Sequence, residues 1–191
     1  MNIEKIYRQR RNVLRVLADE FGSEMVPAKV VRSDGTDIDD SDPQIYAGTT
    51  QILTVLFEDL TSQGIDAIGE FFFIPYKEDD DMQIFQNVIT LDEEVEEEML
   101  PEILLAITAL NNVIPVGSFG VDLAQRRMAY RHSYEMPFPL SDSDLKNFLD
   151  LCMGMAVSMV KEFAYLLAEV ADGSRSAESV VQLFDSDQIL Q

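Results

Sequence analysis

Apolar residues recur along this chain with two different periods, and the two periods predict helices and strands. A spacing of three or four residues, typical of amphipathic helices, predicts helices over 3–21, 44–63, 101–110 and 145–170. A short aromatic run at 69–76 and alternating patterns at 82–91, 119–124 and 128–136 predict strands. Residues 178–190 suggest a short amphipathic helix or a mobile tail. The predicted fold class is therefore α+β.

The order of these elements is α-α-β-β-α-β-β-α, followed by the tail. Two hairpins separated by a helix favour an antiparallel sheet with helices packed on it. Composition then divides the chain into four parts. They are a basic N-terminal helix (1–32), an acidic loop (33–44), an α+β domain (45–172) and a C-terminal tail or short helix (173–191).

The predicted strand at 69–76 is apolar on both faces, whereas a sheet covered by helices on one side needs only one apolar face. Phe71 and Phe73 share one face, and Phe72 and Ile74 share the other with Tyr76. We therefore expect a cover for the second face too. The sequence leaves four covers open: burial within one chain, the N-terminal helix, a second copy of the chain, or a bound partner.

The last long helix would span roughly 40 Å, which exceeds the width of a small sheet, so its overhang could pack on another subunit. Its methionines are first of all core residues, but they also suit an adaptable protein-binding groove. Three ring side chains share one face of the strand at 128–136. The candidate partner surface therefore comprises Phe71, Phe73, Tyr130, His132, Tyr134, Met155 and Met159.

The net charge of −21 is large for 191 residues. It disfavours nucleic acid as a partner, because a binder must neutralise phosphates with lysine and arginine. Residues 1–32 carry seven basic and four acidic side chains, so the acidity lies in the remainder. We expect that acidity to keep the protein soluble. The basic helix could instead dock on an acidic surface of this chain or of a partner. We do not expect it on a membrane, because anionic lipid would repel the rest of the chain.

The compartment follows from what the sequence lacks. Its N-terminus has no apolar run of signal-peptide type, and by inspection no segment approaches the length of a membrane span. A single cysteine, Cys152, can form no internal disulfide. We therefore expect a soluble, cytoplasmic protein.

No catalytic, cofactor-binding or metal-binding constellation is predicted. His132 is the only histidine, so sites that need paired histidines are excluded, and we expect it to bond to a neighbour. Cys152 lies on an apolar stripe and should be a buried small side chain. The acidic loop lacks the ligand spacing of an EF-hand, so we expect a solvated loop there rather than a calcium site. The glutamates of 92–98 suit the start of a helix. The run Ser141-Asp-Ser-Asp144 is an N-cap signature before the last long helix.

A set of motifs lies along the second half of the chain. It comprises Leu110-Asn-Asn before a helix breaker, Gly117-Ser-Phe, Asp122, Tyr130-Arg-His-Ser133, and Ser141 before the long helix. This pattern, over residues 45–171, resembles the YbjN family of bacterial proteins, which are described as sensory transduction regulators. The resemblance implies a fold similar to the type III secretion chaperones. It also implies a protein that is often dimeric, binds other proteins, and has no enzymatic activity or catalytic residues. The family usually has three strands before the middle helix, where this pattern predicts two.

We expect a non-enzymatic protein-binding module, chaperone-like or regulatory, that forms a homodimer and uses no cofactor. The alternative is a small-molecule-binding protein or an enzyme. Its pocket would lie between sheet and helix, near Tyr130, His132 and Tyr134.

Overall fold

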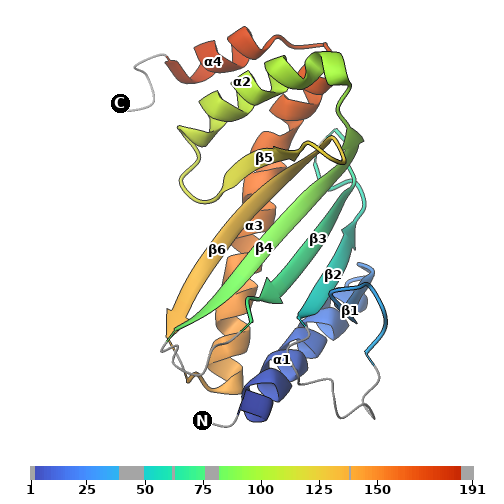
Figure 1. Cartoon of the computed structure of the whole chain (residues 1–191), viewed down its shortest axis with the longest axis vertical. Coiled ribbons are helices and arrows are strands. Elements are labelled where there is room, and N and C mark those ends of the chain that lie inside the picture. Colours follow the sequence, from blue (N-terminus) through green and yellow to red (C-terminus); the bar gives the residue numbers. More distant parts are fainter. Residues whose placement is uncertain (1–2, 39–49, 62, 76–81, 138, 186–191) are drawn as a thin grey trace. The chain divides into compact units, whose positions relative to one another are not determined.

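The structure, a computed structural model, describes residues 3–38, 50–61, 63–75, 82–137 and 139–185. Within these residues it contains a six-stranded antiparallel sheet and four α-helices, so the predicted α+β class is confirmed (Figure 1). The strands are β1 (Ala28–Arg32), β2 (Gln51–Phe57), β3 (Ala67–Phe73), β4 (Met82–Glu94), β5 (Ser118–Asp122) and β6 (Arg127–Pro137). The helices are α1 (Ile3–Ser23), the 3₁₀-helix η2 (Glu97–Met99), α2 (Leu100–Asn111), α3 (Asp142–Ala171) and α4 (Ala177–Asp185).

The strands are arranged in the order β1-β2-β3-β4-β6-β5. The two predicted hairpins are present as β3–β4 and β5–β6, and α2 carries the chain from one to the other (Figure 1). In the second hairpin Phe119 lies opposite Tyr130. In the β1–β2 pair Val30 lies opposite Leu53. Neighbouring strands therefore follow the chain order except where α2 places β5 at the outer edge.

The predicted helix at 44–63 is wrong in its described part, because residues 51–57 form strand β2. Residues 44–49 lie outside the described residues. Every second side chain of β2 is buried, which is the period of a strand, and three of its residues are β-branched. Apolar side chains on both faces of β2 gave this run a helical spacing as well.

Two more strands and one boundary differ from the prediction. Before the middle helix the structure has four strands rather than two, because β1 and β2 join β3 and β4. The acidic run at 92–98 is only partly a helix start, because β4 continues to Glu94 and η2 begins at Glu97. Strand β1 is short and only two of its five residues are apolar valines, so its alternation is too brief to detect.

Helix α3 spans Asp142–Ala171, so it extends the predicted helix at 145–170 at both ends. By length and composition alone it could cross a membrane, which corrects the expectation that no segment reaches that length. A buried core helix of a soluble protein passes the same test. Within the chain, 39 % of the apolar stretch of α3 is buried. Leu149 and Ala156 are fully buried, whereas Leu151 is 61 % exposed.

The contacts of the chain divide it into two compact units, each built from distant segments. Unit 1 comprises Met1–Phe57, Ile68–Val88 and Ser133–Gly154, and unit 2 comprises Glu58–Ala67, Ile89–His132 and Met155–Gln191. Strands β3, β4 and β6 and helix α3 contribute residues to both units.

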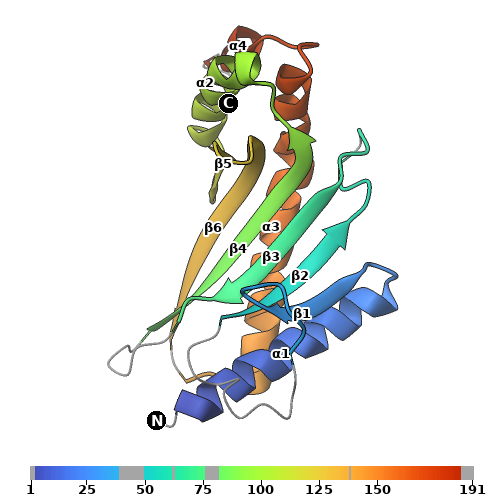
Figure 2. The ribbon, with the colours of Figure 1, turned by 45° about the vertical axis from the view of Figure 1, so that its right-hand side comes forward.

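In unit 1 the basic N-terminal helix packs on its own chain. α1 lies against β1 and β2, and it buries Ile6, Leu14 and Leu17 (Figure 2). An ion pair of 2.8 Å joins Lys146 Nζ of α3 to Glu20 of α1. Of the alternatives for the basic N-terminal segment, packing on the same chain is therefore the one observed for its described residues 3–32.

The predicted N-cap of α3 is confirmed in the same unit. The Ser141 hydroxyl oxygen accepts a hydrogen bond from the Asp144 N–H at 3.1 Å. That hydroxyl also donates to the Asp144 carboxylate at 2.6 Å. The pair satisfies a backbone donor that the first turn of the helix would otherwise leave unpaired.

In unit 2 a side chain closes the outer edge of the sheet. Asn111, the last residue of α2, donates from Nδ2 to the Phe119 carbonyl at 2.9 Å. Its Oδ1 accepts from the Phe119 N–H at 2.8 Å. Asn111 thus pairs both backbone groups of Phe119 that point away from β6, so another strand cannot pair at this position of edge strand β5.

We expect Asn111→Ala to lower the free energy of unfolding by about 2 kcal/mol, because it removes both hydrogen bonds of Phe119 to the α2 side chain. Urea unfolding followed by circular dichroism measures the loss. Asn112→Ala is the matched control, since Asn112 is exposed and should change stability by less than about 0.5 kcal/mol. Equal effects of the two substitutions would contradict this role of Asn111.

Candidate functional site

Three of the seven residues predicted for a partner surface lie in the core. Phe71 and Tyr130 are fully buried, and Phe73 is 5 % exposed. The Phe73 ring lies against the Phe85 ring, with the ring planes tilted by 55° and the centroids 5.1 Å apart. These side chains are covered by their own chain, so they offer no surface to a partner. Alternation had grouped Phe71 with Phe73 correctly, but it could not tell which face of the strand the helices cover.

Tyr130 fills the space between β6 and the loop before β5. Its hydroxyl donates to the Val116 carbonyl at 3.0 Å, and its ring meets Phe119 edge to face at 5.4 Å. Gly117 lies directly against this ring. The ring is therefore part of the packing of unit 2 and lines neither of the two hollows described below.

The other four residues, His132, Tyr134, Met155 and Met159, are half-buried. Burial lowers the pKa of His132. Burial, with a smaller contribution from Cys152, raises the pKa of Tyr134 to about 12, and its hydroxyl donates to the Cys152 carbonyl at 3.3 Å. His132 and Tyr134 are thus held as neutral groups at neutral pH.

Cys152 is a buried side chain, as predicted. It is 1 % exposed, and burial raises the pKa of its thiol to about 12. Such a thiol stays protonated near neutral pH, whereas a cysteine nucleophile reacts as the thiolate. Its carbonyl oxygen also accepts from Asn87 Nδ2 at 2.9 Å, which joins β4 to α3.

One surface of unit 1 is the face of β2, β3 and β4 that no described helix covers. On the covered face Arg10 of α1 lies over the Phe73 ring at 4.5 Å, and Asn87 bonds to α3. Both helices therefore lie on the same side of the sheet. The side chains that point the other way are half-exposed or exposed, and we call them the open face. They are Ile52, Thr54, Leu56, Ile68, Glu70, Phe72, Ile74, Ile84, Gln86 and Val88.

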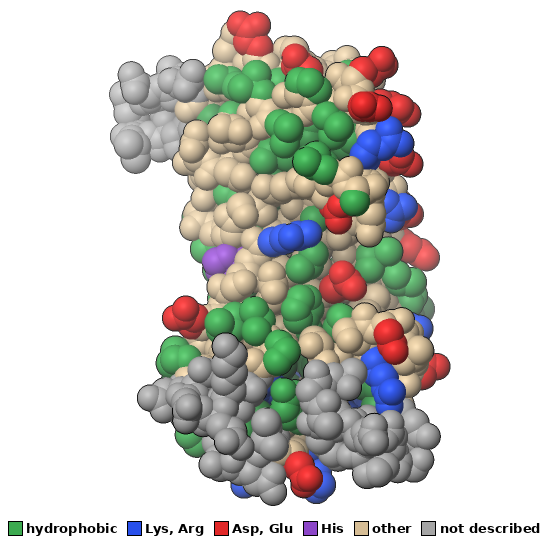
Figure 3. All heavy atoms as spheres, in the orientation of Figure 1, with side chains coloured by type: hydrophobic (Ala, Val, Ile, Leu, Met, Phe, Trp, Pro, Cys, Tyr) green, Lys and Arg blue, Asp and Glu red, His purple; other side chains and the backbone are tan. Residues whose placement is uncertain are grey.

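The open face is unusually apolar for a surface. Seven of its ten side chains are apolar, whereas the solvent side of an antiparallel sheet is ordinarily polar. Leu56 is 46 % exposed and Ile74 is 37 % exposed. Figure 3 shows hydrophobic side chains at the surface over this side of the sheet. Contiguous exposed apolar side chains mark binding surfaces, so the open face is the candidate functional site.

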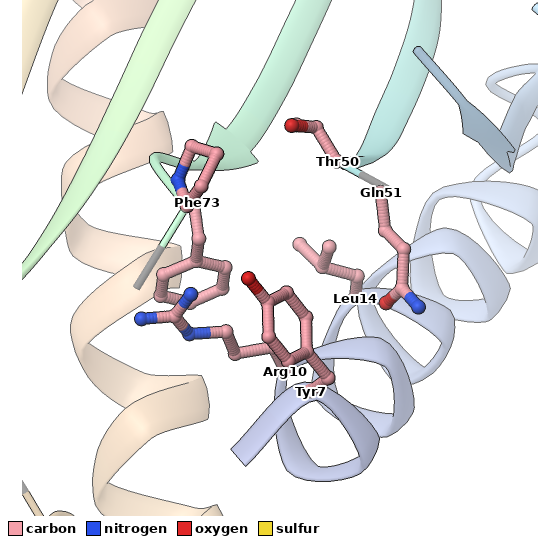
Figure 4. Close-up of a pocket in the computed structure, with 7 residues that line it drawn as sticks. Tyr7, Arg10, Leu14, Thr50, Gln51 and Phe73 are labelled. Atoms are coloured by element: carbon pink, nitrogen blue, oxygen red, sulfur yellow. The ribbon is translucent and has the colours of Figure 1, made fainter. Parts of the chain in front are cut away.

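A hollow between α1 and the sheet is the second feature of unit 1. Figure 4 shows Arg10 beside Phe73, and Gln51 reaching from β2 toward α1. Neither amide atom of Gln51, which is 7 % exposed, has a hydrogen-bond partner among the described residues. The space is about 10 Å³, room for one water-sized group. Small-molecule sites enclose roughly 300 to 1,000 Å³, so this hollow is too small for such a ligand.

Unit 2 has a separate apolar hollow between α2 and α4. Its volume is about 200 Å³, and its lining includes Leu105, Val113, Val181 and Phe184. Figure 3 shows hydrophobic side chains gathered in its upper part, where Figure 1 places α2. A hydrogen bond of 3.2 Å from the Ala177 N–H to the Glu102 carboxylate holds the start of α4 against α2. The hollow is therefore a gap between two helices that pack on each other.

Metal-binding chemistry has no support in the described ranges, where no three His, Cys, Asp or Glu side chains cluster. The chain matches no protein-family model, no curated protein and no solved structure. The resemblance to the YbjN family therefore rests on the sequence motifs and stays a prediction.

The sequence reading missed most of the open face. It noted Phe72 and Ile74 as a second apolar face, but it placed Ile52 and Leu56 in a helix. The detectable signal was a pair of neighbouring strands that are each apolar on both faces. In a sheet covered on one side only, that pattern leaves apolar side chains at the surface.

Proposed function

We propose that this chain is a non-enzymatic protein-binding module, chaperone-like or regulatory, that binds its partner through the open face. The observation that carries the proposal is the apolar composition of a sheet face that no described helix covers. Burying such side chains against a partner is favourable by about 25 cal/mol for each Å² of apolar surface removed from water. A role in the cytoplasm, and membership of a YbjN-like, type III secretion chaperone-like group, belong to the same proposal.

We also propose that the protein forms a homodimer through the outer side of α3. Leu151 on this helix is 61 % exposed, and the half-buried Met155 and Met159 follow it at helical spacing. Burying such an exposed aliphatic side chain against a partner is favourable, because it removes apolar surface from water. This contact is independent of the open face, so each can be tested alone.

The test compares Phe72→Ser on the open face with Leu151→Ser on α3, both in the full-length chain. Tagged protein retains partners from its native cells, and mass spectrometry identifies them. We expect Phe72→Ser to lose a stoichiometric partner that the wild type and Leu151→Ser both keep. The same partners on all three proteins would contradict binding through the open face.

Sedimentation equilibrium of the same purified proteins tests the dimer. We expect the wild type and Phe72→Ser to sediment as dimers and Leu151→Ser to shift toward the monomer. A wild-type protein that stays monomeric at all concentrations would contradict the dimer and leave the partner test unaffected.

A further inference from the structure

The open face offers a partner side chains only, because the backbone groups of its strands are already paired. The N–H and C=O groups of β2, β3 and β4 point along the sheet toward neighbouring strands. A segment that lies across this face must therefore satisfy its own backbone groups. An α-helix does so internally, and helices already cover the opposite face of the same strands. The geometry of the open face thus fits a helix laid on the sheet.

One carboxylate lies within this apolar surface. Glu70 is half-buried, and its neighbours two positions away on β3 are Ile68 and Phe72. The Glu70 carboxylate has no hydrogen bond and no ion pair among the described residues. A charged group that becomes desolvated without a partner is unfavourable, so an occupant must bring a cation to this position.

The strand pairing adds a third apolar neighbour to this carboxylate. The Ile74 N–H donates to the Ile84 carbonyl at 3.0 Å, which sets the register of β3 with β4. In that antiparallel register Val88 lies opposite Glu70. The cation must therefore be flanked by apolar side chains, which is the surface of an amphipathic helix with lysine or arginine in its apolar stripe.

Net charge argues against a second copy of this chain as the occupant. Each copy carries −21, so charge attracts a basic segment to the open face and opposes a second copy there. The dimer proposed through α3 has to offset the same repulsion with apolar contact, whereas a basic helix meets no such repulsion. Among the described helices α1 is the basic amphipathic one, and it already buries its apolar residues Ile6, Leu14 and Leu17 in unit 1. It is therefore not exposed for exchange between copies.

We infer that the open face binds a basic amphipathic helix of a partner protein, with a lysine or arginine of that helix paired to Glu70. This inference rests on the proposed function and adds the chemical class of the partner. Apolar side chains of the helix cover the open face, and its remaining basic residues face the acidic surroundings.

The probes are two helical peptides, both with leucine at every third or fourth position. One carries lysine at all other positions, and the other carries glutamate. Fluorescence anisotropy measures their affinity for the full-length protein. We expect the lysine peptide to bind at least about tenfold more tightly. Phe72→Ser should weaken its binding by at least about fivefold, because it removes apolar contact area.

Charge reversal at Glu70 is the decisive comparison. Glu70→Lys should lower the affinity for the lysine peptide by about tenfold and raise the affinity for the glutamate peptide. Glu98→Lys is the matched control. Glu98 is exposed on η2 in unit 2, and its replacement by lysine changes the net charge of the protein by the same amount. We expect it to change either affinity by less than about twofold. Circular dichroism establishes that each variant is folded.

The outcomes separate this inference from the proposed function. If Phe72→Ser weakens binding but the Glu70 and Glu98 variants behave alike, the open face binds proteins and the inference about a basic helix is overturned. If Phe72→Ser has no effect on either peptide, both are overturned. If Phe72→Ser instead abolishes self-association in sedimentation, the occupant is a second copy and the inference is wrong.

Discussion

Replacing Gly117 with alanine is expected to lower the free energy of unfolding by about 4 kcal/mol. Gly117 has a φ of +71°, which disfavours any residue with a Cβ atom. A Cβ at this position would overlap the Tyr130 hydroxyl oxygen and Cζ, and it would lie 2.7 Å from Cε2. The ring cannot move aside, because Tyr130 is fully buried and bonds to the Val116 carbonyl. Urea unfolding followed by circular dichroism measures the change.

Gly35→Ala is the control that separates backbone strain from the steric overlap. Gly35 has a φ of +79°, but a Cβ there would meet no atom within 4 Å. Its substitution should therefore cost only about 1 kcal/mol. If Gly117→Ala fails to fold, combining it with Tyr130→Leu should recover part of the loss, because the overlapping atoms are removed. Equal costs for the two glycine substitutions would contradict the packing of Tyr130 against Gly117.

Phe71→Ala is expected to cost about 4 kcal/mol, whereas Phe72→Ala, at the next position of the same strand, should cost about 1 kcal/mol. Phe71 is fully buried, so its removal leaves a cavity in unit 1. Phe72 is half-exposed on the open face, where water can fill the space. Thermal and urea unfolding of the two variants measure the difference.

This pair of substitutions also tests the open face. A folded Phe72→Ala protein shows that the side chain is dispensable for stability, which is what a side chain kept for binding requires. The opposite result would be a large loss for Phe72→Ala and a small one for Phe71→Ala. It would mean that the covered and open faces of β3 are exchanged, and the partner surface would then have to be placed elsewhere.

Local signals in the sequence were enough to predict the helices and strands of the second half of the chain. Ser141 and Asp144 cap α3 where a capping motif was read, and the hairpin of β5 and β6 lies where alternation was read. Both depend on residues within a few positions of one another, so the sequence contains the whole interaction. The prediction for residues 51–57 was wrong because the deciding interaction is not local. The apolar residues of this run fit either period, and only pairing with β1 made it a strand.

For the candidate partner surface, too, the sequence predicted local features but not long-range packing. The sequence identified Phe71 and Phe73 as apolar side chains on one face, but it could not tell that the helices would cover that face. Met155 and Met159 were read correctly as belonging to one helix. The sequence did not predict a role for Glu70. It is one of 35 acidic residues, and only the sheet shows that its neighbours are apolar.

The sequence by itself determined the α+β class, the two hairpins around a middle helix, the long last helix and the acidic character of the chain. Each follows from residue type and short-range spacing, which act before any long-range contact forms. Only the tertiary structure decided that β1 and β2 extend the sheet, that α1 packs on its own chain, and which face of β2, β3 and β4 the described helices leave without a cover. These features depend on which distant segments share the buried apolar surface, and several arrangements satisfy the same local pattern.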